Sequence, residues 1–314
     1  MDNREEIRAF LKSRRDKITP EQVGLPTYGN RRVTGLRRSE VAVLAGVSVE
    51  YYTRLERGNL GGVSDSVLEA LSQALRLDDI ERTHLHDLAR AAQAAPGRAR
   101  RRPVPSAAPA AVRPAVRRIV EGMPGLPAFV QNNRFDVLFA NPLARALYSE
   151  MYADPAAGAN TTRFVFYSPA ARRFYTDWER VARGAVGALR IEAGKNPYDR
   201  ELSNLIGELS TRSDTFRVLW GAHDVHVFRE GTKRFRHPVV GDLALDHQAM
   251  ILPGESGQSV VVYSAPAGTA AEDGLKLLAS WSVTADDARH APAGADSSDA
   301  GDPEAEEPSP GPRV

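Results

Sequence analysis

The chain has 314 residues, no cysteine and a formal net charge of +1, and this length suffices for two domains with their own cores. The lack of cysteine excludes disulfides and thiolate metal sites and is typical of a reducing cytoplasm. No apolar run approaches the roughly 20 residues that span a bilayer, and Met1 to Lys12 is too charged for a signal peptide. We therefore expect a soluble, cytoplasmic protein.

Charge is distributed unevenly along the chain. Residues 1–102 contain 19 Lys and Arg against 14 Asp and Glu, whereas residues 285–314 contain 2 Arg against 8 Asp and Glu. A basic N-terminal part and an acidic tail indicate a nucleic-acid partner for the N-terminal part.

The first predicted element is a helix close to the N-terminus. Ile7, Phe10 and Leu11 form an apolar stripe at helical spacing, and Pro20 ends this element. The polar loop that follows, residues 21–38, carries four arginines that flank the next helix: Arg31, Arg32, Arg37 and Arg38. Each arginine alone serves solubility as readily as phosphate contact, but beside a helix that enters a DNA groove phosphate contact is favoured.

Residues 39–58 have the pattern of two short helices joined by a tight turn at residues 44–47. Ala42 is small enough to let the two helices approach closely, and Gly46 can adopt the positive φ of such a turn. Ser48 is placed to cap the second helix with its hydroxyl. This order of features predicts a helix-turn-helix motif.

The second helix of this motif has one apolar and one polar face. Tyr52 and Leu55 point one way, and the opposite arc of about 100° contains four polar side chains, which are Glu50, Thr53, Arg54 and Arg57. Arginine can pair with guanine, glutamate with cytosine, and threonine with a base edge or a thymine methyl group in the DNA major groove. The alternative is an ordinary solvated helix face, and the complete pattern around the turn favours DNA.

Two further helices are predicted over residues 64–75 and 78–92, which completes five helices and a compact all-α domain. His84 and His86 are two positions apart and face different sides of a helix, so they do not form a metal pair. We interpret both as structural or surface residues.

These residues resemble a known family. The run RRVTGLRRSEVAVLAGVSVEYYTRLERG, followed by VSDSVLEALSQALRL, resembles the Xre family, the five-helix, lambda-repressor-like domain of phage repressors and Cro. The resemblance covers residues 1–93 and implies base-reading positions at Ser48, Val49, Glu50, Thr53, Arg54 and Arg57. Ser48 and Val49 come from the family pattern alone, and packing is an alternative role for Val49.

Two segments have compositions that do not support a core. Residues 94–115 are rich in Pro, Ala and Arg, which predicts a flexible linker. Residues 283–314 are rich in Asp, Glu, Pro, Ala and Gly, which predicts a disordered acidic tail.

Between them, residues 116–282 form a second predicted domain. Strand-like runs cover residues 128–131 and 135–140, with Asn132-Asn133 as a turn, and helical patterns follow over residues 169–192, 198–211 and 214–221. Period-two patterns then cover residues 225–229, 233–238, 240–252 and 259–265, separated by turns at Glu230-Gly231 and residues 254–257, before a closing helix at 274–281. This order predicts an α+β domain with an antiparallel sheet of about five strands packed on helices.

Enzyme and metal motifs do not emerge from this second domain. Residues 254–258 lack the spacing of a nucleophile elbow, and no phosphate-binding or dinucleotide loop is visible. His223 and His226 have helical spacing for a metal pair, but Val225 begins a predicted strand, so they need not share a face. We therefore expect a protein that is not an enzyme and holds no metal or cofactor.

Aromatic residues are the remaining signal, and a pocket between helices and sheet is the usual place for a ligand in such a fold. Most of them must be core. As candidates for the pocket, aromaticity selects Phe129, Phe139, Phe164, Phe174, Trp178 and Trp220, together with His223.

A second resemblance covers about residues 104–281. The runs AFVQNNRFDVLFANPLARALY, FRVLWGAHDV, FRHPVVGDLAL and SVVVYSAPAGT are similar to the ligand-binding domain of MmyB-like regulators. These join an Xre domain to a PAS-like sensor domain, and some members bind a fatty acid. The resemblance implies a small apolar or amphipathic effector and no position-by-position assignment of its contacts.

Together these observations predict a one-component transcription regulator that binds a pseudo-palindromic operator in double-stranded DNA as a homodimer and senses a small effector. Its place would be the cytoplasm, associated with the nucleoid through DNA. The alternative is a DNA-binding scaffold or antitoxin-like regulator whose second domain only contacts other proteins.

Overall fold

The computed structural model describes residues 3–26, 31, 33, 35–93, 111–225, 230–254 and 257–290. The predicted linker and tail therefore lie largely outside the described residues, as do Arg32 and His226. None of the described helices combines the length and the apolar character that a membrane-spanning segment requires.

The described residues of the N-terminal part form helices and no strand, as predicted. The helices are α1 (Asn3–Lys17), the short 3-10 turn η1 (Glu21–Val23), α2 (Arg38–Leu44), α3 (Val49–Glu56), α4 (Asp65–Ala74) and α5 (Asp79–Gln93). Their apolar stripes meet in one core, in which Phe10, Tyr52 and Leu85 are fully buried. Burial of these stripes against one another is what stabilises helices as short as α2 and α3.

The second part contains a five-stranded sheet, and every strand pair in it is antiparallel, which confirms the predicted α+β class. The strand order is β2-β1-β5-β4-β3. The strands are β1 (Ala128–Gln131), β2 (Val137–Ala140), β3 (Glu230–His237), β4 (Gly241–Ile251) and β5 (Ser259–Ser264).

Helices cover both faces of this sheet. Helix α6 (Pro114–Glu121) packs Val116 and Val120 on the outer face, against Val130 and Val260. The inner face carries Phe129, Leu245 and Tyr263 and shares one core with six helices. These are α7 (Pro142–Leu147), α8 (Ser149–Ala153), α9 (Thr161–Tyr167), α10 (Pro169–Phe174), α11 (Trp178–Lys195) and α14 (Ala270–His290). Helices α12 (Arg200–Arg212) and α13 (Asp214–Gly221) pack with α11 in a separate apolar cluster.

Several predicted boundaries were wrong. The helix expected over residues 169–192 is broken at residues 175–177, because Tyr175 bridges to Phe235 of β3 and the Thr176 amide donates to the carbonyl of Arg234 at 3.1 Å. The expected turn at Glu230-Gly231 lies inside β3, where both residues pair with β4. The strand expected at residues 225–229 lies outside the described residues except for Val225, which belongs to no strand.

The predicted linker and tail both extend too far into the folded part. Val112 is buried under the sheet and Pro114 begins α6, so residues 111–115 are part of the second fold. Helix α14 continues to His290, eight residues past the expected end of the domain at Ser282. In both places a tertiary contact or helix continuation overrides a composition that, taken alone, is typical of disorder.

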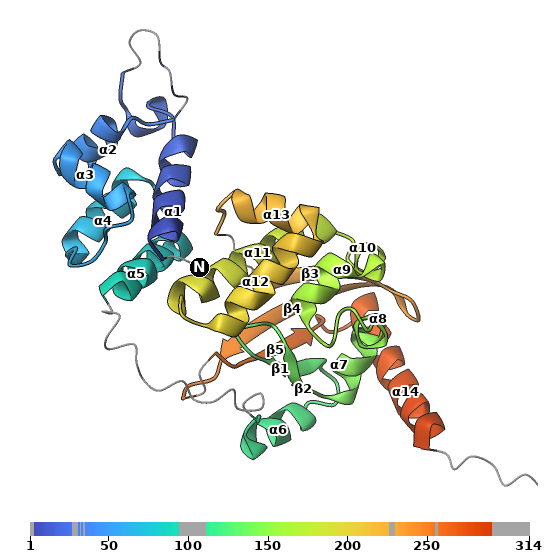
Figure 1. Cartoon of the computed structure of the whole chain (residues 1–314). Helices are drawn as coiled ribbons and strands as arrows, with labels where there is room; N and C mark the ends of the chain where they lie inside the picture. Colours follow the sequence, from blue (N-terminus) through green and yellow to red (C-terminus); the bar gives the residue numbers. More distant parts are fainter. Residues whose placement is uncertain are drawn as a thin grey trace, which may run out of the picture.

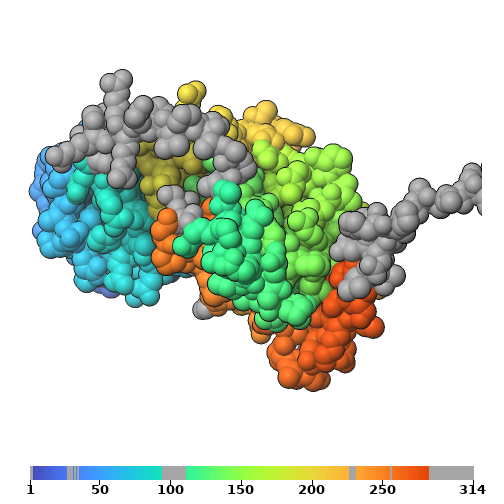
Figure 2. All heavy atoms as spheres, turned by 90° about the horizontal axis from the view of Figure 1, so that it is seen from below, coloured from blue at the N-terminus to red at the C-terminus, as the bar shows by residue number. Residues whose placement is uncertain are grey.

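The two parts contact each other through their helices. Helix α5 packs against α11, and α1 contacts α11 and the residues that follow α13, whereas α2 and α3 lie on the far side of the N-terminal part (Figure 1). In the space-filling view, α1–α5 (blue to cyan) form one end of the molecule and α14 (orange to red) projects at the opposite end (Figure 2).

Candidate nucleic-acid interface and ligand cavity

The turn between α2 and α3 has the predicted geometry. Gly46 adopts a φ of 64°, and the Val47 amide donates to the carbonyl of Ala42 at 2.9 Å. The hydroxyl of Ser48 accepts from the Tyr51 amide at 3.0 Å, which caps α3. With Tyr52 and Leu55 fully buried, the axial rotation of α3 is fixed and its opposite face points outward.

The predicted base-reading side chains all belong to this outward face. Thr53 is partly exposed, and Val49 has 39% of its surface exposed. The guanidinium of Arg54 lies 5.0 Å from the ring centre of Tyr51, a cation–π contact that orients the side chain along the helix. The remaining members of the set are exposed: Ser48, Glu50, Arg54 and Arg57.

The flanking arginines divide into two groups. Arg31 is largely buried and binds Glu40 at 2.7 and 2.9 Å, so it holds the loop onto α2 and is not placed for phosphate. Arg37 and Arg38 are exposed beside the N-terminus of α2. Arg38 also donates to the buried Glu56 at 3.0 Å, so the Arg38 side chain is partly exposed and also contacts α3.

A buried carboxylate ties three helices of this part together. Glu56, only 2% exposed, accepts from Arg15 of α1 at 3.0 and 3.1 Å as well as from Arg38 of α2. Burial raises the pKa of Glu56, but the hydrogen bonds and charges of the two arginines outweigh it and lower the pKa overall. The position of α3 relative to α1 therefore rests on a charged contact as well as on apolar packing.

Two cations that the sequence did not single out join the candidate DNA surface. Arg8 and Lys12 of α1 line a groove with Arg38, Glu56 and Arg57. They are four residues apart and lie on the exposed side of α1, opposite its apolar stripe. That spacing was available in the sequence, but their proximity to α3 depends on how α1 packs. A basic groove at the C-terminal end of the recognition helix suits the DNA backbone.

A cavity of about 450 Å³ lies between the inner face of the sheet and helix α11. This volume falls in the usual range for small-molecule sites, about 300–1,000 Å³. Small residues on α11, such as Gly184 and Ala188, leave the space, and Phe129 and Val261 supply apolar wall from the sheet. Phe135 also lines it, with a φ of 65° that is unusual for a bulky residue.

Polar and apolar side chains share the lining of this cavity, and three of the polar groups meet at Tyr263. The hydroxyls of Tyr148 and Tyr263 lie 2.7 Å apart, and the Lys233 ammonium donates to the Tyr263 hydroxyl at 3.3 Å. Burial is the main cause that raises the pKa of Tyr148 well above its ordinary value, so this phenol stays neutral. Lys233 lies on the inward face of β3, the same face as Phe235 and His237. Its place in the cavity was not predicted from the sequence.

Most of the aromatic candidates lie outside the cavity lining. Phe129 lines the cavity, but Phe164 and Phe174 are fully buried in the core beside it. Phe139 packs on the outer face near α6, under the guanidinium of Arg117. The other three also lie outside the cavity lining: Trp178, which donates to the Val165 carbonyl at 3.0 Å, Trp220, which stacks on Phe216, and His223. Aromatic residues fill the core here because they bury the most surface, so aromaticity alone does not mark a cavity wall.

Comparison with known families agrees with this division of the chain. A family model described as a helix-turn-helix domain matches residues 6–85, and the model of the MmyB-like transcription regulator ligand binding domain matches residues 112–278. No curated protein matches the chain. The combination makes this a DNA-binding transcription regulator with a ligand-binding domain. Since the second match spans more than half of the 314 residues, the chain belongs to the family of regulators with an MmyB-like ligand-binding domain.

Proposed function

We propose that this regulator binds a two-fold symmetric operator as a homodimer and that its effector is an apolar molecule with a carboxylate, such as a fatty acid. The observation that carries the effector class is the position of Lys233. Its ammonium lies beside the Tyr263 hydroxyl within a cavity whose lining combines apolar side chains, such as Phe129 and Val261, with polar ones. The site thus offers a cation and hydroxyl groups beside apolar surface.

The neighbouring cations support this choice. Arg234 pairs with Asp177 at 3.3 Å and Lys195 pairs with Glu192 at 2.9 Å, so these cavity cations are already neutralised. Among the described side chains, no carboxylate pairs with Lys233. A ligand carboxylate would complete the ion pair, and hydrogen bonds to charged groups contribute about 1.5–3 kcal/mol.

The effector class is tested by native mass spectrometry of the purified full chain, followed by lipid extraction and titration with the fluorescent fatty acid 11-(dansylamino)undecanoate. We expect a bound carboxylic acid and saturable binding of the probe. Lys233→Met should lower the affinity for the probe by about tenfold or more. Lys276→Met, on the surface of α14, should leave this affinity unchanged. Absence of any bound acid and of probe binding would contradict the proposal and favour a domain that only contacts proteins.

The size of the reading surface supports the proposed dimer. A single α3 offers few base-reading side chains, and two-fold pairing doubles the contacts by placing two such helices about 34–36 Å apart on one face of DNA. Light scattering on the full chain at micromolar concentration tests this part. A mass of two chains is expected, and a single-chain mass both free and on DNA would contradict it.

A further inference from the structure

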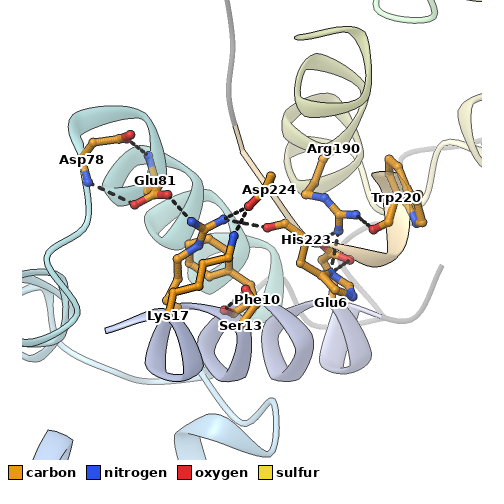
Figure 3. Close-up of polar contacts among 11 residues, drawn as sticks. Glu6, Phe10, Ser13, Lys17, Asp78, Glu81, Arg190, Trp220, His223 and Asp224 are labelled. Carbon is orange, nitrogen blue, oxygen red and sulfur yellow. Dashed lines mark hydrogen bonds and ion pairs between the residues drawn. The ribbon is translucent and has the colours of Figure 1, made fainter. Parts of the chain in front are cut away.

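Helix α11 stands between the cavity and the helix-turn-helix part, and its side chains reach both. Toward α1, Arg190 is fully buried and forms an ion pair with Glu6 (Figure 3). The same guanidinium contacts His223 Nδ1 at 2.9 Å, donates to the carbonyl of Trp220 and lies 4.1 Å from the centre of that indole ring. Arg190 therefore links α1 to α11 and to the end of α13.

A second group of charges holds the other half of α1 against the same region. Arg14 binds Glu81 of α5 at 2.5 Å and donates to the carbonyl of His223 at 2.8 Å. Asp224 lies 3.4 Å from Arg14 and also pairs with Lys17 (Figure 3). Such partners offset the cost of burying a guanidinium, so Arg14 is accommodated at the contact between the two parts.

Apolar and steric contacts complete this docking interface. Ile191 of α11 and Val225, both buried, are members of the core cluster of α1–α5. Gly194 lies so close to His84 of α5 that a Cβ built on it would be 2.7 Å from the ring Cε1. Only glycine fits at this position without displacing the buried His84 ring.

The face of α11 that lines the cavity lies next to the face that contacts α1 and α5. Ala188, Ile191 and Lys195 line the cavity, while Arg190 and Gly194 face α1 and α5. Ile191 belongs to both sets, because it lines the cavity and packs in the core of the first five helices. One side chain thus contacts both the cavity and the DNA-binding part.

We propose that effector binding is coupled to docking of α1 and α5 on α11, and that an effector in contact with Ile191 and Ala188 stabilises the docked arrangement. This inference rests on the proposed function of the cavity. Since α3 lies on the side of its domain away from α11 (Figure 1), docking leaves its outward face free. It fixes instead how the recognition helix is oriented relative to the ligand-binding domain, and hence to a second copy on an operator.

Linkage makes the coupling reciprocal. If the effector raises the docking equilibrium constant by some factor, loss of docking lowers the affinity for the effector by the same factor. The factor expected of such couplings is about 5–150-fold. A substitution at the docking interface, away from the cavity, should therefore lower the affinity for a ligand that it does not touch.

Gly194→Ala is the sharpest such substitution, with Gly207→Ala as its matched control. Gly207 is exposed in α12 and has open space where a Cβ would stand. Titration of the full chain with 11-(dansylamino)undecanoate should show about fivefold or greater weakening in Gly194→Ala, no weakening in Gly207→Ala, and recovery in Gly194→Ala/His84→Ala. Glu6→Gln provides an independent variant should Gly194→Ala fail to fold.

Hydrogen exchange of the α1 and α5 amides supplies the second readout. In the wild-type chain, dodecanoate should slow this exchange by about fivefold or more, and in Gly194→Ala the response should be lost. Probe binding with unchanged α1 and α5 exchange, or an affinity that Gly194→Ala and Glu6→Gln leave unaltered, would overturn the coupling alone. Failure of the wild-type chain to bind either acid would overturn the proposed effector class, and the coupling with it.

Discussion

The carboxylate of Glu6 and the guanidinium of Arg190 form an ion pair between residues 184 positions apart, with 5% and 0% of their side chains exposed. Burial alone would raise the pKa of Glu6, but the neighbouring His223, 3.8 Å away, and the charge of Arg190 lower it to about 2. The pair therefore stays charged at neutral pH and joins the DNA-binding part to the ligand-binding part.

Removing one partner of this pair should be strongly destabilising. Glu6→Gln leaves the buried Arg190 without its counterion, and we expect the free energy of unfolding in urea to fall by about 3–5 kcal/mol. Glu5→Gln, an exposed neighbour on α1, should change it by less than about 0.5 kcal/mol. The double variant Glu6→Gln/Arg190→Met should regain most of the loss, because both charges are gone. Equal stabilities of Glu6→Gln and Glu5→Gln would show that the pair contributes nothing.

Acid should weaken the same interface through His84. Burial lowers the pKa of His84 from 6.5 to about 4; the carboxylate of Glu6 opposes this, and the cations Arg190, Arg14 and Lys195 add to it. The folded state disfavours the charged ring. The stability that comes from burying the neutral ring is therefore fully present above about pH 6.5 and is lost as pH falls toward 4. Thermal melts should show the decrease over this window, with a smaller slope in His84→Asn. Parallel pH profiles of the two proteins would refute the assignment.

Arg54 and Lys12 should affect DNA binding in different ways. Arg54→Ala removes an exposed side chain of α3 and should cost about 1–3 kcal/mol on the preferred site while relaxing base preference at one position. Lys12→Ala, in the groove beside α3, should weaken all sequences equally and reduce the salt slope by about 1. Fluorescence anisotropy on matched and mismatched duplexes at several salt concentrations separates the two. If Arg54→Ala instead weakens binding to all duplexes equally, Arg54 contacts only phosphate.

Filling the cavity should remove effector binding without unfolding the chain. Ala188 is half-buried on the cavity side of α11, and Ala188→Phe places a ring in the space that an apolar ligand would occupy. We expect at least about tenfold weaker binding of 11-(dansylamino)undecanoate, with a melting temperature within a few degrees of wild type. Unchanged affinity in a folded Ala188→Phe protein would place the ligand elsewhere.

Local chemistry explains why the helix-turn-helix was predictable. Gly46 and Ser48 act on their own backbone neighbours, through a positive φ and a capping hydrogen bond, and these effects are visible in a short sequence window. The strands were predictable for the same reason, since their period of two is local. The break at Tyr175 was not, because it is imposed by a bridge to Phe235, sixty positions away.

The cavity and the docking interface depend on contacts between distant segments. Phe129 and Phe139 are both aromatic strand residues, but one faces the cavity and the other faces α6. Nothing local in the run around Gly194 indicates that His84 will occupy the space beside it. Which aromatic lines a wall, and which glycine admits a neighbour, is decided by packing between elements far apart in the chain.

Selection of bound sequences from a pool of random DNA duplexes by the full chain tests the central claim most directly, because the protein itself picks out its operator from the pool. We predict enrichment of one two-fold symmetric sequence whose half-sites are centred about 10–10.5 base pairs apart, or a multiple of that spacing. The Arg54→Ala protein, selected in parallel, should enrich a related sequence with one relaxed position in each half-site. Recovery of no common sequence by the wild-type chain would contradict the account.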